Sequence, residues 1–310
     1  MQVSEVELCA NPVAPLVDVS AQTARFTFRI GGISFALFAP ASMDVVLDPE
    51  MTPFQVGVSR TDVRLDVDWA DRLQMPSASA LFDSGGLWSL FEESNGYAFY
   101  LRTSFLGAAP YKAAWFDRDF RRGRISLARQ FYNPSRSVNP LEYPLDELLA
   151  MHRLSCEGGV EVHAVGVVDE FGRGHLFIGH SGAGKSTTAR LWQKRRGARI
   201  LSDDRIILRI ENGRPRMYGT PWHGDAGLAL ADSADLSAIY FLEHGSRNKL
   251  TLLPAIRAAA EVLARSFVPH HSADALESTL WSLDRITRQT PCSLFQFVPD
   301  QSAVEMICRG

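Results

Sequence analysis

The chain has 310 residues, 46% of them hydrophobic, which is enough for one large or two medium-sized domains with substantial cores. Its formal net charge of −3 gives no electrostatic basis for binding nucleic acid. No apolar run reaches membrane-spanning length, and residues 1–15 lack the basic start and apolar stretch of a signal peptide. These features predict a cytoplasmic protein with neither nucleic-acid nor membrane partners, and they leave open whether it forms a homo-oligomer.

The first part of the chain alternates apolar and polar residues in short runs, as half-buried β-strands do. Strands are expected at 26–30, 33–37, 61–67, 87–92, 97–103, 115–120 and 124–127. Gly31-Gly32 and other short glycine-containing turns separate successive runs, which favours hairpins. We therefore predict a β-rich, mostly antiparallel N-terminal domain over residues 1–140, ending in the turn-rich stretch 133–140.

The second part, residues 141–310, mixes helical and strand patterns. Helices are expected at 144–153, 185–196, 254–267 and 273–288, and strands at 160–168, 174–178, 199–204, 205–210, 215–219, 236–242 and 293–298. A short turn at 170–173 joins the first two strands, so they are expected to be antiparallel. This predicts an α/β domain whose antiparallel pair differs from the parallel layout of common phosphate-loop folds.

A phosphate-loop pattern, G-x-x-x-x-G-K-[ST], follows the second of these strands at Gly179 to Ser186. Gly182 and Gly184 lack a Cβ, so the backbone can turn tightly and bring its N–H groups close to phosphate oxygens. Lys185 can reach the β- and γ-phosphates, and the Ser186 hydroxyl can bind Mg²⁺. The expected nucleotide-binding residues are Gly179, Ser181, Gly182, Ala183, Gly184, Lys185, Ser186 and Thr187.

Paired carboxylates, Asp203 and Asp204, end the strand after the phosphate-loop helix. Phosphoryl transfer needs a carboxylate that holds Mg²⁺, and often a second one that accepts the proton of the attacking hydroxyl. Adjacent side chains on a strand point to opposite faces, so one of the two is expected to aim into the site. His163 lies in the strand that leads into the phosphate-loop hairpin. It is either a hydrogen-bonded core histidine or the partner that orients a site carboxylate.

These motifs together resemble the HPr serine kinase family, which is related in fold to ATP-dependent phosphoenolpyruvate carboxykinase. The resemblance is carried by Val162-His163-Ala164, Val168-Asp169, the phosphate loop and Asp203-Asp204, within residues 152–242. More closely, the chain resembles the HPr-kinase-like proteins of bacterial peptide gene clusters, and its segment 220–224 is also similar to that branch. Some of those proteins phosphorylate a serine of a ribosomally made precursor peptide, as in lasso-peptide clusters. The longer segment with which HPr kinases bind HPr and perform phosphorolysis is not found, so HPr is not expected as the substrate.

The resemblance implies an HPr kinase/phosphoenolpyruvate carboxykinase-like nucleotide domain behind the β-rich N-terminal domain. It also implies a phosphotransferase that uses ATP and Mg²⁺ to phosphorylate a serine hydroxyl of a peptide or protein. The implied catalytic residues are Asp203, His163, Asp204 and Lys185. Asp203 is preferred as the general base, with His163 orienting it. Asp204 is then the metal ligand beside Ser186.

Two alternatives use the same core: a kinase with a small-molecule acceptor, and a nucleotide-binding regulatory ATPase without an acceptor. A guanine-specific N-K-x-D motif is incomplete at 248–251, and no L-S-G-G-Q-like signature of ABC-type ATPases follows the loop. Trp222 and His223 either shape an acceptor pocket or belong to a packed loop. His180, inside the phosphate loop, is assigned no role.

Overall fold

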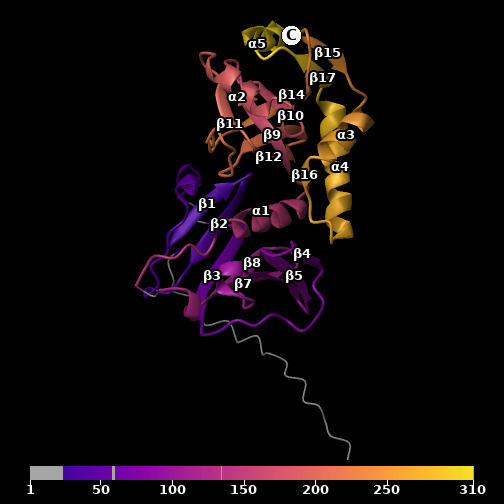
Figure 1. Ribbon diagram of the computed structural model, residues 1–310. Helices are drawn as coiled ribbons and strands as arrows, with labels where there is room; N and C mark the ends of the chain where they lie inside the picture. The colour runs from indigo at the N-terminus through magenta and orange to yellow at the C-terminus, as the bar shows by residue number, and fades with distance from the viewer. Residues whose placement is uncertain (1–23, 58–59, 134, 310) are drawn as a thin grey trace, which may run out of the picture.

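The computed structural model describes residues 24–57, 60–133 and 135–309. This part of the chain forms two large β-sheets, and the helix α1 (Leu145–Ser155) lies between them (Figure 1). The protein is therefore of mixed α/β class. No helix in the described ranges is long and apolar enough to cross a membrane. The expectation that residues 1–15 form no signal peptide lies outside these ranges.

The first sheet has eight strands in the order β1-β2-β3-β8-β7-β6-β5-β4. They are β1 (Phe26–Ile30), β2 (Ile33–Phe38), β3 (Val63–Ala70), β4 (Phe82–Asp83), β5 (Trp88–Glu93), β6 (Gly96–Leu101), β7 (Lys112–Asp117) and β8 (Arg122–Ala128). The expected hairpins β1–β2, β5–β6 and β7–β8 are confirmed as antiparallel pairs. The exception to the antiparallel pattern is β3, which runs parallel to both β2 and β8 because the chain crosses over before and after it.

The turn of the β7–β8 hairpin lies earlier than expected, at residues 118–121 rather than 121–123. Asp117 Oδ1 accepts hydrogen bonds from the N–H groups of Arg121 at 2.7 Å and Arg122 at 3.2 Å. Phe120 adopts a φ of 53° in this turn. The Asp117 side chain thus closes the turn before the glycine that marked it in the sequence.

The second sheet has nine strands, most of them in the order β10-β9-β12-β13-β14-β17-β15. They are β9 (Val160–Val168), β10 (Gly174–Ile178), β11 (Arg199–Ser202), β12 (Arg205–Glu211), β13 (Arg214–Gly219), β14 (Ser233–His244), β15 (Lys249–Leu252), β16 (Ser266–Phe267) and β17 (Cys292–Phe297). The expected antiparallel pairing of β9 with β10 is confirmed. Because β10 also pairs with β14, the path from β10 through β9, β12 and β13 to β14 closes on itself.

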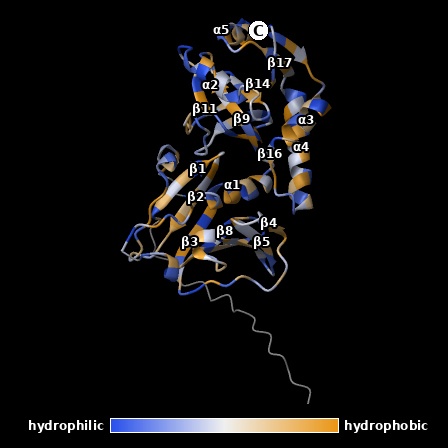
Figure 2. Cartoon of the chain, in the orientation of Figure 1, coloured by the Kyte–Doolittle hydropathy of each residue, from blue (hydrophilic) through white to orange (hydrophobic). Residues whose placement is uncertain are grey.

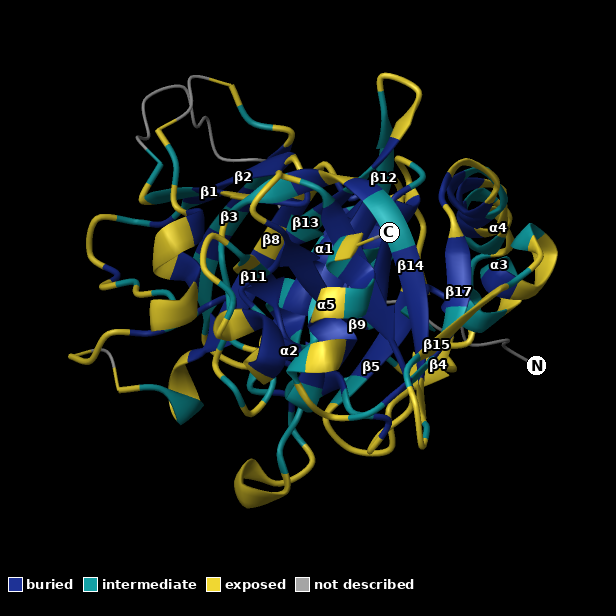
Figure 3. Ribbon diagram, turned by 90° about the horizontal axis from the view of Figure 1, so that it is seen from above, coloured by how far each residue is buried: buried dark blue, intermediate teal, exposed yellow. Residues whose placement is uncertain are grey.

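Two pairs of helices cover opposite faces of the second sheet (Figure 3). Beside α1, the helices are α2 (Lys185–Gln193), α3 (Ala255–Leu263), α4 (Ala273–Gln289) and α5 (Gln301–Arg309). Phe177 is buried with Trp192 of α2 and Ile307 of α5, whereas its neighbour Ile178 is buried with Val262 of α3 and with α4. Successive side chains of a strand point to opposite faces, so one strand builds both cores.

Two helices end earlier than expected, and one was not expected at all. α2 ends at Gln193 rather than at 196, and α3 ends at Leu263 rather than at 267. The residues after α3 instead form β16, which pairs with β9. The unexpected helix is α5, whose apolar residues Val304 and Ile307 are buried.

Helix α1 belongs to the hydrophobic core of the first sheet. Its residues Leu145, Leu148, Leu149 and Leu154 are buried there, and Ile207 of β12 joins the same core. Figure 2 shows hydrophobic residues along α1 and the strands β1 to β3 that it faces. The domain boundary at 140/141 stays a prediction: α1 follows that boundary in the sequence, yet it packs on the first sheet.

Candidate active site

The site lies where β9 changes its pairing partner. The first half of β9 pairs with β12, with His163 opposite Arg205, and its second half pairs with β10, with Ala164 opposite Ile178. The Ala164 N–H group donates to the Asp204 carbonyl oxygen at 3.0 Å. The end of β10 and the start of β12 therefore meet beside His163. The end of β10 leads into the phosphate loop, and the start of β12 follows the two aspartates.

Residues 179–184 form the loop between β10 and α2. Gly184 has a φ of 100°, and a Cβ at this position would lie 2.5 Å from Cζ of the Phe297 ring. A larger residue would be strained in its backbone and would clash with the ring, so the pattern glycine is required here. On the other side of the loop, His244 Nε2 lies 2.8 Å from the Gly182 carbonyl oxygen. The loop leads directly into α2, and the first N–H groups of a helix have no partner within the helix itself.

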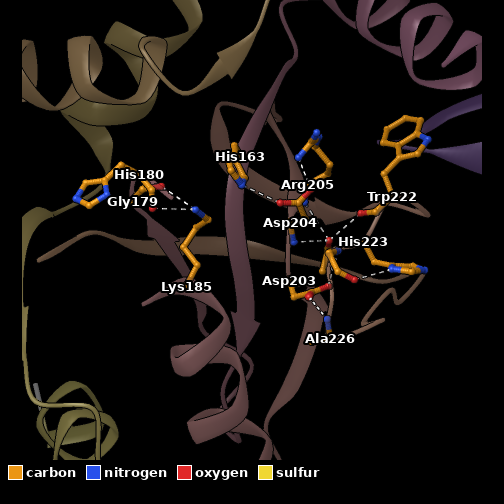
Figure 4. A network of polar contacts seen from close by, with 12 residues as sticks. His163, Gly179, His180, Lys185, Asp203, Asp204, Arg205, Trp222, His223 and Ala226 are labelled. Atoms are coloured by element: carbon orange, nitrogen blue, oxygen red, sulfur yellow. Dashed lines mark hydrogen bonds and ion pairs between the residues drawn. The ribbon is translucent and has the colours of Figure 1, made fainter. Parts of the chain in front are cut away.

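Lys185, the first residue of α2, folds back against the loop that precedes it. Its Nζ donates to the carbonyl oxygens of Gly179 at 2.8 Å and His180 at 3.3 Å (Figure 4). Burial lowers the pKa of the Lys185 ammonium; Asp204 opposes this effect, and Arg265 and Arg205 add to it. The only partners of this cation in the described hydrogen-bond network are neutral carbonyl groups, so it is poised to meet an anion.

Asp203 is buried and holds the loop that follows β13. Its carboxylate accepts hydrogen bonds from the N–H groups of Gly224 at 3.1 Å, Ala226 at 3.0 Å and Leu228 at 3.2 Å. A carboxylate that accepts three backbone N–H groups organises the chain around it. Asp203 therefore holds the 224–228 loop in place through these three hydrogen bonds.

Asp204 faces His163. The His163 Nε2 atom lies 2.8 Å from Asp204 Oδ1, and Arg205 Nη1 donates to Asp204 Oδ2 (Figure 4). Burial alone would raise the pKa of the Asp204 carboxyl, but the hydrogen bond from His163 and the charges of Arg205, His163 and Lys185 lower it below its usual value. Asp204 is therefore ionised at neutral pH. The sequence led us to expect His163 beside Asp203, whereas the structure pairs it with Asp204.

A pocket of about 440 Å³ opens between the phosphate loop and the two aspartates, a size typical of small-molecule sites. It is lined by His163, Ser181, Gly182, Gly184, Lys185, Ser186, Thr187, Asp203, Asp204, Gly224 and Asp225. Of these, Gly224 and Asp225 were not among the predicted site residues; their one sequence signal is that they end or follow the segment 220–224. Two predicted residues lie behind the lining: Gly179 offers its carbonyl to Lys185, and Ala183 is buried in the core.

The oxygen atoms around this pocket fit a magnesium ion that travels with phosphate groups. No three His, Cys, Asp or Glu side chains in the described chain form a protein-only metal site. Mg²⁺ bound to a nucleotide needs only one or two protein oxygens beside the phosphates and water. The Ser186 hydroxyl and the carboxylates of Asp203 and Asp204 line the same pocket, so the donor set matches this requirement.

Trp222 packs away from the pocket. Its Nε1 donates to Asp146 Oδ2 at 2.7 Å, and its ring contacts the core of the first sheet. His223 Nδ1 lies 2.9 Å from the Gly224 carbonyl oxygen. The interpretation of Trp222 as part of a packed loop, rather than of an acceptor pocket, therefore fits these contacts. His180 Nδ1 contacts the Ser181 carbonyl oxygen at 2.7 Å, within the loop itself.

No protein-family model matches the chain, and no curated protein matches it. Among solved structures, the chain is similar to the Hpr(Ser) kinase/phosphatase from Coxiella burnetii, at 16% sequence identity and a TM-score of 0.28. The aligned region covers 48% of this chain and 93% of that chain. A TM-score this low does not establish a common fold, so a functional conclusion has to come from the site.

Proposed function

We propose that the protein is a phosphotransferase that uses ATP and Mg²⁺ to phosphorylate a serine hydroxyl of a peptide or protein. One observation carries the proposal: a phosphate-loop lysine and a histidine-paired carboxylate open onto the same pocket. Lys185 supplies a cation for the transferred phosphoryl group, and Asp204 supplies a proton acceptor. A site that only binds nucleotide has no need for the second of these.

The phosphate loop and the start of α2 are proposed to hold the nucleotide phosphates. The backbone N–H groups of Gly182 and Gly184 and the dipole of α2 favour the anionic oxygens. When phosphates enter, Lys185 can exchange its bonds to the carbonyl groups of Gly179 and His180 for stronger, charge-assisted ones. Ser186 and a carboxylate oxygen of the aspartate pair would hold Mg²⁺, which neutralises charge on the β- and γ-phosphates.

Asp204 is proposed as the general base. The serine oxygen bonds to the γ-phosphorus as the bond to the β,γ-bridging oxygen breaks, and the serine proton passes to Asp204. His163 holds the carboxylate in place through Oδ1. This assignment moves the base from Asp203, which was preferred from the sequence, to Asp204. Asp203 is buried with its oxygens held by three backbone N–H groups, whereas the Asp204 side chain is 24% exposed.

The acceptor class rests on the sequence resemblance, and the two alternatives predict other products. The test is incubation with γ-³²P-labelled ATP and Mg²⁺ in parallel reactions with serine-containing peptides, with a metabolite panel, and without acceptor. We expect label in an acid-stable serine phosphoester of a peptide. Label in a metabolite alone would support the small-molecule kinase. Phosphate release at one rate in all reactions would support the regulatory ATPase and contradict the proposal.

A further inference from the structure

We propose that the first turn of α1, through its adjacent residues Asp146 and Glu147, positions both carboxylates of the site and thereby couples the first sheet to catalysis. The inference builds on the proposed function of Asp204. It assigns Asp146 and Glu147 as positioning residues, because neither lines the pocket.

Glu147 reaches Asp204 through one arginine. Glu147 Oε1 accepts a hydrogen bond from Arg205 Nε at 2.7 Å, and Arg205 Nη1 donates to Asp204 Oδ2. The planar guanidinium offers its donors in a fixed fork, so anchoring one edge sets the direction of the other. The Arg205 group also lies over the Phe267 ring at 4.2 Å, which limits its sideways movement. Glu147 thus fixes the side of Asp204 opposite His163.

Asp146 reaches Asp203 through the loop that begins at Trp222. Asp146 Oδ2 accepts the Trp222 Nε1–H group at 2.7 Å. The N–H groups of Gly224, Ala226 and Leu228, directly after this anchor, hold the Asp203 carboxylate. Figure 4 shows Trp222 on the far side of the aspartates from Lys185. Two neighbouring residues of one helical turn therefore reach two neighbouring site carboxylates by separate routes.

A third acid, Glu161, lies beside Arg205. Glu161 Oε1 on β9 lies 3.4 Å from Arg205 Nε, and the Glu161 side chain is buried. Burial and the nearby charge of Glu147 raise the pKa of Glu161 well above its usual range. The raised pKa favours the protonated form of Glu161, so this group competes less strongly than it otherwise would with Glu147 and Asp204 for the Arg205 charge.

Helix α1 takes its own position from the first sheet. Leu145 directly precedes the two acids and is completely buried, and Leu148 and Leu149 follow them into the same core. Side chains packed in a close-packed core move little without cost. The first sheet therefore fixes the position of this helical turn relative to the site.

The chain offers a matched control for this inference. Glu157, just after α1, joins the same helix to the same strand: its Oε1 pairs with Arg153 of α1, and its Oε2 pairs with Arg209 Nη2 at 2.7 Å. This pair lies farther along β12, away from Asp204. We expect Glu147→Ala to lower kcat by about 10- to 100-fold while the dissociation constant for Mg·ATP stays within about threefold. Glu157→Ala is expected to change neither by more than about threefold.

A second readout separates this inference from the proposed function. The imidazole ¹⁵N signals of His163, assigned with a His163→Gln variant, are recorded at one fixed pH. We expect them to shift in Glu147→Ala and to stay in place in Glu157→Ala. If the wild-type protein transfers no phosphoryl group, the proposed function fails, but these spectra still test the positioning. His163 signals that are unchanged in Glu147→Ala would overturn the inference, as would equal kcat values for the two alanine variants.

A conservative variant covers the case in which Glu147→Ala does not fold. Glu147→Gln keeps an oxygen that can accept from Arg205 and loses only the charge. We expect it to show at least about tenfold higher kcat than Glu147→Ala, or, if the alanine variant is unfolded, a smaller His163 shift than a Glu147→Met variant. Identical behaviour of Gln and the apolar substitution would contradict the positioning role.

Discussion

His163 Nε2 lies 2.8 Å from Asp204 Oδ1, while the adjacent Asp203 accepts hydrogen bonds from three backbone N–H groups. The two aspartates form the bend between Ser202, the last residue of β11, and Arg205, the first residue of β12. Both aspartates line the pocket, but the Asp203 carboxylate holds a loop, whereas the Asp204 carboxylate lies between a histidine and an arginine. Substitutions of the two residues are therefore expected to have different effects.

Asp203→Asn is expected to destabilise the protein. The amide NH₂ group would face N–H groups that now donate to a buried carboxylate, which leaves donors without acceptors. We expect the free energy of unfolding, measured by urea titration, to fall by about 1–3 kcal/mol. The control is Asp225→Asn, which alters another carboxylate of the same pocket. Equal unfolding midpoints for the two variants would contradict the loop-holding role of Asp203.

Lys185→Met is expected to weaken nucleotide binding. Methionine keeps the apolar stem but removes the cation that is proposed to contact the β- and γ-phosphates. Loss of charge-assisted hydrogen bonds predicts a dissociation constant for Mg·ATP at least about tenfold higher, measured by titration calorimetry. Lys194→Met, at the exposed end of α2, serves as the control and is expected to bind like the wild type. A normal affinity of Lys185→Met would place the nucleotide elsewhere.

The stabilising effect of Asp204 is expected to depend on pH in a defined direction. The folded-state pKa of Asp204 lies below its unfolded value of about 4. The ionised group therefore contributes stability that is present above about pH 4 and is lost as the pH falls through the folded-state pKa. This contribution is measured as the difference in the free energy of unfolding between wild type and Asp204→Asn, by urea titration at several pH values between 3 and 7. We expect the difference between the two proteins to shrink below about pH 4, and a difference that grows on acidification would contradict the account.

Local patterns in the sequence were sufficient for most of the elements that build the site. The β9–β10 pair, the loop at 179–184 and the start of α2 were predicted because each depends on neighbouring residues: strand periodicity, a short turn and glycines. The same holds for the hairpin β12–β13 after Asp204. The pocket residues on β9, in the loop and at the start of α2 could be predicted from these local patterns. They are His163, Ser181, Gly182, Gly184, Lys185, Ser186 and Thr187.

Features that depend on contacts between distant residues were not predictable in this way. Which aspartate meets His163 depends on where β11 ends and on the loop at 224–228, which claims Asp203. The link from Glu147 to Arg205 spans 58 residues, and nothing local in either segment indicates it. The parallel pairing of β3 with β2 and β8 likewise depends on long crossings of the chain. Such relationships appear only when both partners are placed in space.

Single-turnover transfer from γ-³²P-labelled Mg·ATP by Asp204→Asn tests whether Asp204 accepts the proton of the attacking hydroxyl. The variant is compared with wild type at saturating nucleotide, after calorimetry has measured its nucleotide affinity. We expect transfer at least about 100-fold slower than wild type, with the dissociation constant for Mg·ATP within about threefold. Transfer within about threefold of the wild-type rate would show that Asp204 is not the base and would contradict the account.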